Sequence, residues 1–155
     1  PGVGPRRAAA IRDSLTAMLD RSRRRRRGPV PPPGVEPGVS LLLEVDRRYR
    51  DEAAAGKLPT IAPRRFNPQG RAWLPVLHAS IDGWHVTALY SNTARAHELD
   101  RVFDWVVIYF HRDAQPELQR TVVTEMRGAL AGRRVVRGRE AECRAWYFSQ
   151  PEAAR

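Results

Sequence analysis

The chain has 155 residues, of which 42% are hydrophobic, so there is room for one domain with a core and a small appendage. Its net charge of +10 favours a polyanionic partner, either nucleic acid or an anionic membrane surface. A single cysteine excludes an intrachain disulfide and a cysteine-built zinc site, and no apolar run approaches the roughly 20 residues that cross a bilayer. A cytoplasmic location is the default expectation.

The positive charge is concentrated at the N-terminal end. Residues 1–39 hold nine arginines against three acids, a balance of +6, whereas residues 40–70 and 71–155 each have a balance of +2. Lys57 is the only lysine, so part of the arginine content reflects the bias of a GC-rich coding sequence rather than phosphate binding. That bias does not explain the clustering, which predicts a polyanion contact near the N-terminus.

Two segments are predicted before the main domain. Residues 5–20 are predicted to form a helix that starts at Pro5 and carries apolar side chains at the spacing of one face, namely Ala8, Ile11, Leu15 and Met18. Residues 23–39 combine an arginine run with closely spaced prolines and glycines. We expect them to form a stiff, charged linker with polyproline character.

Residues 40–150 are expected to form an α+β domain, in which helices lie on one side of an antiparallel-leaning sheet. The first helix is predicted over residues 40–55, with Ser40 as its N-cap and Gly56 as its stop. The proline-rich residues 57–70 are expected to be an extended connection.

The remaining elements are mostly strands. Asp82 and Gly83 are a hairpin signal between two predicted strands. The apolar run over residues 104–110 has the length and composition of a central strand. The predicted elements are strands over 72–80 and 84–91, a helical turn over 93–99, strands over 104–110 and 120–127, a short strand or loop edge over 133–138, and a helix over 140–148.

The first eleven residues carry the most informative pattern. Gly2 and Gly4 flank Val3, and glycine lets the backbone turn tightly and approach a ligand closely. Because a predicted helix follows at once, its free N–H groups and positive dipole end would face a bound anion. Arg6 and Arg7 add charge at the same place. The pattern predicts a phosphate site.

This segment resembles the helix-hairpin-helix family, whose hairpin has Gly-hydrophobic-Gly, then a small residue and an aliphatic one where Ala8 and Ile11 stand. Residues 1–22 would be the second half of that motif, and its first helix would precede Pro1. The resemblance implies sequence-independent binding of DNA phosphates through the backbone of Gly2, Gly4 and Arg6. A glycine pair before an ordinary helix and a solvated tail are the alternatives. The linker adds Arg23, Arg24, Arg25, Arg26 and Arg27 to the predicted contact.

A second resemblance covers most of residues 40–148. The segments that begin at Leu41, Ser91, Asp104 and Arg134 look like the C-terminal region of bacterial helix-hairpin-helix proteins. The front end of those proteins is similar to the N-terminal DNA-binding domain of family X DNA polymerases. The polymerase palm needs Gly-Ser followed by Asp-x-Asp, which this sequence lacks, so polymerase activity is not implied. The resemblance implies DNA repair or recombination and leaves the role of this domain open.

An enzymatic alternative depends on three residues. Asp104, Glu125 and Arg127 resemble the Asp…Glu-x-Lys arrangement of metal-dependent nucleases, with arginine in place of lysine. A third hypothesis is a protein-interaction module with a basic tail. We favour DNA binding without catalysis, and we expect no cofactor.

Other residues have two interpretations each. Four arginines near Gly132 and Gly138 are a candidate second DNA contact, namely Arg133, Arg134, Arg137 and Arg139. Surface ion pairs with Glu140 and Glu142 are the other explanation for the same residues. His78 and His85 are expected to face each other across the hairpin without a third metal ligand, so no metal site is predicted. Four tryptophans (Trp73, Trp84, Trp105 and Trp146) offer rings for stacking on unpaired bases, although core packing suits Trp105 better.

Overall fold

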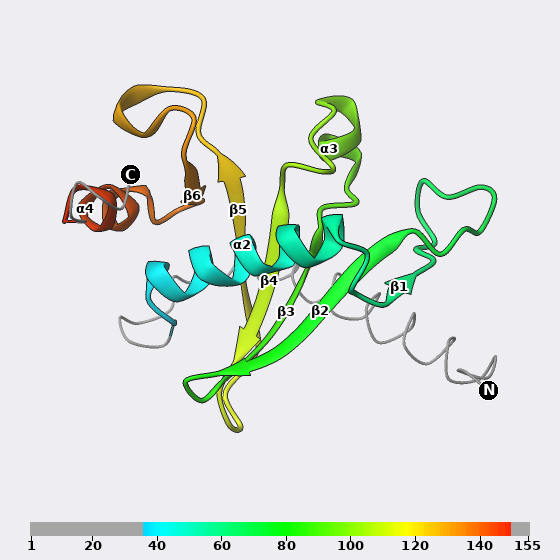
Figure 1. Cartoon of the computed structure of the whole chain (residues 1–155), viewed down its shortest axis with the longest axis horizontal. Helices are drawn as coiled ribbons and strands as arrows, with labels where there is room; N and C mark the ends of the chain where they lie inside the picture. The colour runs from blue at the N-terminus through cyan, green and yellow to red at the C-terminus, as the bar shows by residue number, and fades with distance from the viewer. Residues whose placement is uncertain (1–35, 150–155) are drawn as a thin grey trace.

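The computed structural model describes residues 36–149, which form a six-stranded antiparallel sheet with three α-helices (Figure 1). The strands cross the sheet in chain order, from β1 to β6, and each is antiparallel to its neighbour. This architecture confirms the expected α+β class. No helix within this range is long and apolar enough to traverse a bilayer.

The elements occur in this order: α2 (Val39–Ala54), β1 (Thr60–Ile61), β2 (Leu74–Ile81), β3 (Trp84–Tyr90), α3 (Ala94–Glu98), β4 (Val106–His111), β5 (Leu118–Thr124), the 3-10 turn η1 (Gly128–Leu130), β6 (Arg134–Val136) and α4 (Glu140–Ser149). Strand β1 was not predicted, because residues 57–70 look like an extended connection. In the structure Thr60 and Ile61 pair with Pro75 and Leu74 at the start of β2.

Helix α2 begins and ends on backbone signals. Its N-cap is Gly38 rather than the predicted Ser40, and Gly38 makes no side-chain cap; its carbonyl accepts from the N–H groups of Leu41 and Leu42. The predicted stop at Gly56 is confirmed. Gly56 has φ +69°, in the left-handed region that favours glycine, and its N–H donates to Ala53.

The folded unit starts earlier than predicted, since residues 36–39 were assigned to the linker. Pro37 and Val39 are buried, and the Glu36 carboxylate accepts hydrogen bonds of 2.7 and 2.8 Å from Arg120 on β5. The carbonyl of Pro37 accepts another from Arg139, at 2.6 Å. The composition of this segment suggests a linker, but these partners lie more than 80 residues away in the chain.

The hairpin between β2 and β3 is confirmed. Asp82 and Gly83 have φ values of +50° and +82° and form a two-residue turn that pairs Ile81 with Trp84. Positive φ at both central residues is the requirement of a type I′ turn, which Asp-Gly satisfies readily.

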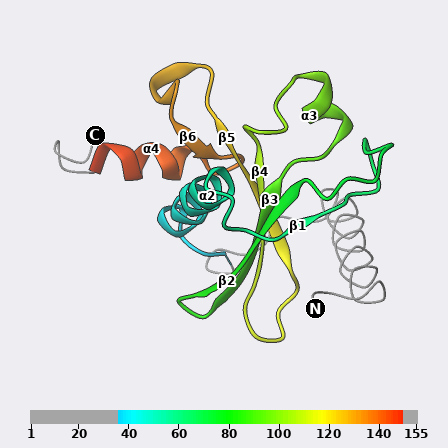
Figure 2. The same ribbon diagram turned by 45° about the vertical axis from the view of Figure 1, so that its right-hand side comes forward.

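Helix α2 lies across one face of the sheet, and α4 lies beside it at the β6 edge (Figures 1 and 2). The expected central strand is confirmed as β4, which pairs with β3 and β5 and is buried from Val106 to Phe110. Strand β5 spans Leu118–Thr124 rather than residues 120–127. The last segment is indeed a strand, because residues of β6 pair with β5.

One side chain of α2 bridges two strands where their ladder ends. The last regular pair between β2 and β3 is Val76 with Leu89. Beyond it the N–H of Tyr90 donates to the Tyr49 hydroxyl at 2.9 Å, and that hydroxyl donates to the carbonyl of Pro75 at 2.7 Å. Burial raises the pKa of Tyr49 far above its ordinary value, so the hydroxyl stays protonated as the bridge requires.

Candidate functional site

The predicted phosphate site at Gly2, Val3, Gly4, Arg6 and Arg7 lies outside the described residues. The same is true of the arginine run over residues 23–27. Both stay predictions.

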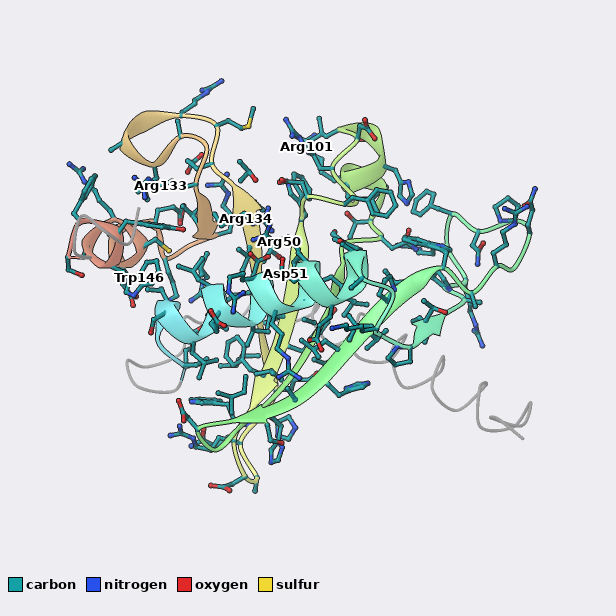
Figure 3. All side chains as sticks on the ribbon, in the orientation of Figure 1. Arg50, Asp51, Arg101, Arg133, Arg134 and Trp146 are labelled. Carbon is teal, nitrogen blue, oxygen red and sulfur yellow. The ribbon has the colours of Figure 1, made fainter. Side chains whose placement is uncertain are left out.

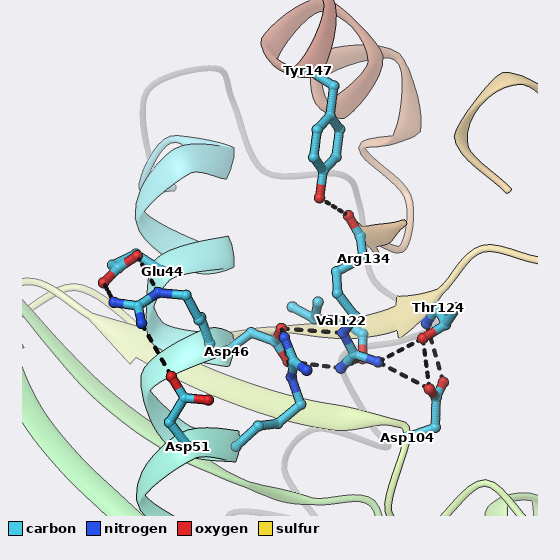
Figure 4. A network of polar contacts seen from close by, with 10 residues as sticks. Glu44, Asp46, Asp51, Asp104, Val122, Thr124, Arg134 and Tyr147 are labelled. Atoms are coloured by element: carbon cyan, nitrogen blue, oxygen red, sulfur yellow. Dashed lines mark hydrogen bonds and ion pairs between the residues drawn. The ribbon is translucent and has the colours of Figure 1, made fainter. Parts of the chain in front are cut away.

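A cluster of hydrogen bonds and ion pairs is centred on Asp46, a fully buried residue of α2 (Figure 4). Its two carboxylate oxygens accept hydrogen bonds from Arg134, at 2.7 and 3.1 Å. Arg50, one turn further along α2, donates at 3.1 Å to the same carboxylate. In Figure 3 these two arginines approach from α2 and β6. A buried carboxylate needs such partners, because burial alone would strongly disfavour its charge.

Arg134 extends this contact to a second carboxylate. Its Nη1 donates to Asp104 and to the Thr124 hydroxyl, both at 3.1 Å, and its Nη2 also donates to the carbonyl of Val122 at 3.2 Å. The side chain is 14% exposed. Because its donors are already engaged within the fold, Arg134 is not placed to meet a phosphate, contrary to the candidate second DNA contact. We call Asp46, Arg50, Arg134, Asp104 and Thr124 the interior charge network.

Asp104 is part of the interior charge network, and it is also one of the three residues on which the nuclease hypothesis depends. Thr124 donates to it twice, from its hydroxyl at 2.7 Å and from its N–H at 3.1 Å. Burial opposes ionisation of Asp104, but the bonds from Thr124 and the charges of Arg134 and Arg101 outweigh it and hold its pKa below the ordinary value. The carboxylate is thus ionised and ties the residues before β4 to β5.

The other two residues of the nuclease hypothesis have different surroundings. Glu125 bonds to Arg137 at 2.9 Å, which lowers the pKa of Glu125, and Arg127 is exposed at the start of η1. Asp104 and Glu125 are thus each engaged by an arginine, which a divalent cation would have to displace. Among residues 36–149 no three His, Cys, Asp or Glu side chains are grouped to hold a metal ion.

The remaining arginines of the candidate second contact mostly form ion pairs. Arg137 pairs with Glu125 and, at 3.7 Å, with Glu140. Arg139 pairs with Glu142 at 2.5 Å and is 10% exposed. Arg133 stacks on Tyr147, 4.9 Å from the ring centre. The ion-pair interpretation therefore accounts for Arg137 and Arg139 in the structure.

The histidines do not meet as expected. The register places His78 opposite Thr87 and Ser80 opposite His85, so His78 and His85 are diagonal neighbours. His85 instead stacks on His111 of β4, with ring centres 5.0 Å apart. His78, His85 and His111 all line an open hollow of about 470 Å³ on the sheet, but within the described range no three such side chains are grouped to hold a metal ion.

The tryptophans are packing residues to different degrees. Trp84 is 4% exposed, with the Arg112 guanidinium 4.2 Å from its ring centre. Trp105 and Trp146 are partly buried against the core. Trp73 is also partly buried, and its ring packs edge-to-face with Phe103, which is 70% exposed.

A surface that was not predicted from the sequence is made by residues 62–73, between β1 and β2, and residues 91–103, which include α3. The side-chain amide of Asn92 donates to the carbonyl of Arg65 at 2.9 Å, and the Phe66 ring lies against His97 with ring centres 4.4 Å apart and the ring planes tilted by 36°. These contacts join the two segments, which we call the loop–α3 surface. The consecutive Arg64, Arg65 and Phe66 were the available signal, since cations beside an aromatic ring are typical of nucleic-acid contacts.

Comparison with known proteins yields no relative: no protein-family model matches the chain, and neither a curated protein nor a solved structure is detectably similar to it.

Proposed function

We propose that the protein binds DNA without base preference, and that residues 1–27 supply most of its phosphate contacts. The observation that carries the proposal is the difference in charge between the two parts of the chain. Residues 1–35 hold nine arginines against two acids, whereas residues 36–149 hold 17 basic groups against 14 acidic ones. A polyanion is attracted chiefly to the first part.

Ion pairing within the domain strengthens this contrast. Carboxylates of the same domain engage several of its guanidinium groups, which are therefore less available to phosphate. These arginines are Arg47, Arg48, Arg50, Arg120, Arg134, Arg137 and Arg139.

The proposed contact uses the helix-hairpin-helix resemblance. The backbone around Gly2 and Gly4 would approach a phosphate closely, Arg6 would add an N–H donor, and the arginines of residues 23–27 would add charge. None of these groups reads a base edge, so one sequence should bind as well as another. We place this activity in the cytoplasm and in DNA repair or recombination, as the resemblance implies.

A salt titration of duplex binding by the full chain tests the proposal. Each neutralised phosphate releases roughly 0.9 counterion, so the log–log slope of affinity against salt should be several units. A flat affinity, or a strong preference for one sequence, would contradict the proposal.

A matched pair of variants separates the hairpin from the charge. Changing Gly2 and Gly4 to valine keeps the net charge but blocks the close backbone approach, so duplex affinity should fall. Changing the arginines of residues 23–27 to glutamine should weaken binding equally on all sequences and lower the salt slope. If the glycine variant binds like the wild type, the hairpin is not the contact. Magnesium-dependent cleavage in the same samples would instead favour the nuclease alternative.

A further inference from the structure

The loop–α3 surface holds the excess charge of the folded domain. Its two segments contain five arginines against two acids, a balance of +3, and residues 36–149 together also have a balance of +3. The rest of the domain is thus electrically balanced. The five arginines are Arg64, Arg65, Arg71, Arg95 and Arg101.

The loop that presents these cations is held by side-chain amides rather than by a ladder. Asn67 donates to the carbonyls of Pro63 and Arg71 at 3.0 and 2.9 Å, and its side-chain oxygen accepts from the Arg71 N–H at 3.1 Å. Asn92 holds the carbonyl of Arg65 and also bonds to His97 at 2.7 Å. The backbone of the loop is therefore ordered against α3 before any ligand arrives, which lowers the entropic cost of binding.

Two aromatic side chains of the loop–α3 surface are exposed to solvent. Phe66 is 48% exposed and has φ +53°, a left-handed conformation that a bulky residue rarely adopts. Phe103 is 70% exposed, and its ring packs edge-to-face with Trp73 and Tyr90 at centre distances of 5.9 and 5.3 Å. Both rings are supported from within the protein and keep area open to solvent. Core packing would instead have buried them.

We propose that the loop–α3 surface binds single-stranded nucleic acid, with unpaired bases stacking on Phe66 and Phe103 and with Arg65 and Arg95 contacting phosphates. The inference rests on the proposed function, because it assumes that the protein binds nucleic acid. A single strand offers unpaired bases, whose π-faces stack on aromatic rings, and phosphates, which bind cations. The exposed rings and arginines of this surface match both groups. Among the described residues neither Arg65 nor Arg95 forms an ion pair with a carboxylate.

A duplex fits this surface less well than a single strand. Bases in a duplex are stacked on one another, so their faces are not available to Phe66 and Phe103. The N-terminal residues would therefore bind phosphates of any DNA, and the folded domain would select strands with unpaired bases.

The test compares two ligands on the full chain. Fluorescence anisotropy would follow binding to a labelled oligothymidylate of roughly 16 nucleotides and to a duplex of equal length. Changing Phe66 and Phe103 to leucine keeps apolar side chains but removes their π-faces. We expect oligothymidylate affinity to fall about 5- to 100-fold for each ring, with duplex affinity unchanged.

Matched controls lie on α4, at the opposite end of the sheet (Figure 1). Phe148 is an exposed aromatic residue, and Arg144 is an exposed cation. Phe148→Leu should leave oligothymidylate affinity unchanged. Arg65→Gln with Arg95→Gln should lower the salt slope for the single strand by up to about 1.4, whereas Arg144→Gln should not. Circular dichroism would verify that every variant is folded.

The outcomes separate the two proposals. If Phe66→Leu with Phe103→Leu binds oligothymidylate like the wild type, or if Phe148→Leu loses as much affinity, the single-strand site is wrong. An equal loss for duplex and single strand also overturns it. If the duplex does not bind but oligothymidylate does, and only the surface variants weaken it, the proposed duplex function fails while this site stands.

Discussion

Arg134 and Arg65 carry the same guanidinium group in opposite surroundings. Arg134 lies in the interior charge network, where Asp46 and Asp104 occupy its donors. Arg65 lies on the loop–α3 surface, exposed and, as far as the structure describes the chain, without a carboxylate partner. The difference teaches that the position of the carboxylates in the fold, rather than the number of arginines, decides which cations remain for a ligand. Variants that disturb the two regions should therefore have different effects.

The largest expected effect comes from removing the carboxylate at the centre of the network. Asp46→Ala leaves the Arg134 charge without its main partner in the interior, and breaking a buried pair in this way costs about 3–5 kcal/mol. Urea unfolding of the full chain, followed by tryptophan fluorescence, would measure the loss.

The control for this variant is Asp51→Ala, on the same helix. Asp51 is 66% exposed and pairs with Arg47, so its removal should leave the unfolding midpoint close to that of the wild type. Equal losses in both variants would show that the interior network has no special role in stability.

The second effect concerns the bridge between β2 and β3. Tyr49→Phe removes the hydroxyl that joins Tyr90 and Pro75 and leaves two part-buried backbone groups without this partner. We expect a loss of about 1–3 kcal/mol in the free energy of unfolding. Phe103→Leu, on the loop–α3 surface, should change it by less than about 0.5 kcal/mol. A comparable loss in both variants would contradict the contrast between the two regions.

The smallest effect is a dependence on pH. Because the pKa of Asp104 is lowered in the folded state, its carboxylate stabilises the fold above the unfolded pKa of about 3.9, and this stability is lost as pH falls through the folded pKa. Asp104→Asn should therefore cost about 1–2 kcal/mol at neutral pH and progressively less below pH ~4. Unfolding of both proteins across this range would check it; a difference that stays constant with pH would contradict it.

Local chemistry made several elements predictable. Asp82 and Gly83 specify their turn because they tolerate positive φ, and Gly56 ends α2 for the same reason. The apolar run in β4 predicted a central strand because such a run must be buried on both faces. Each of these signals depends on residues within a few positions of one another, so the sequence alone was sufficient.

The partners of the charged residues depend on the tertiary structure. Asp46 and Arg134 are 88 residues apart, and Glu36 and Arg120 are 84 apart. From the sequence, Arg134 was expected at a candidate phosphate contact and Glu36 in a linker, because neither residue type nor spacing shows which carboxylate a guanidinium will reach. Strand β1 was missed for a similar reason, since its two residues become a strand by pairing with β2. The sequence by itself thus determined the Asp-Gly turn, the C-terminal end of α2 and the buried strand. Only the fold decided which arginines are neutralised, because an ion pair depends on distances that chain folding creates.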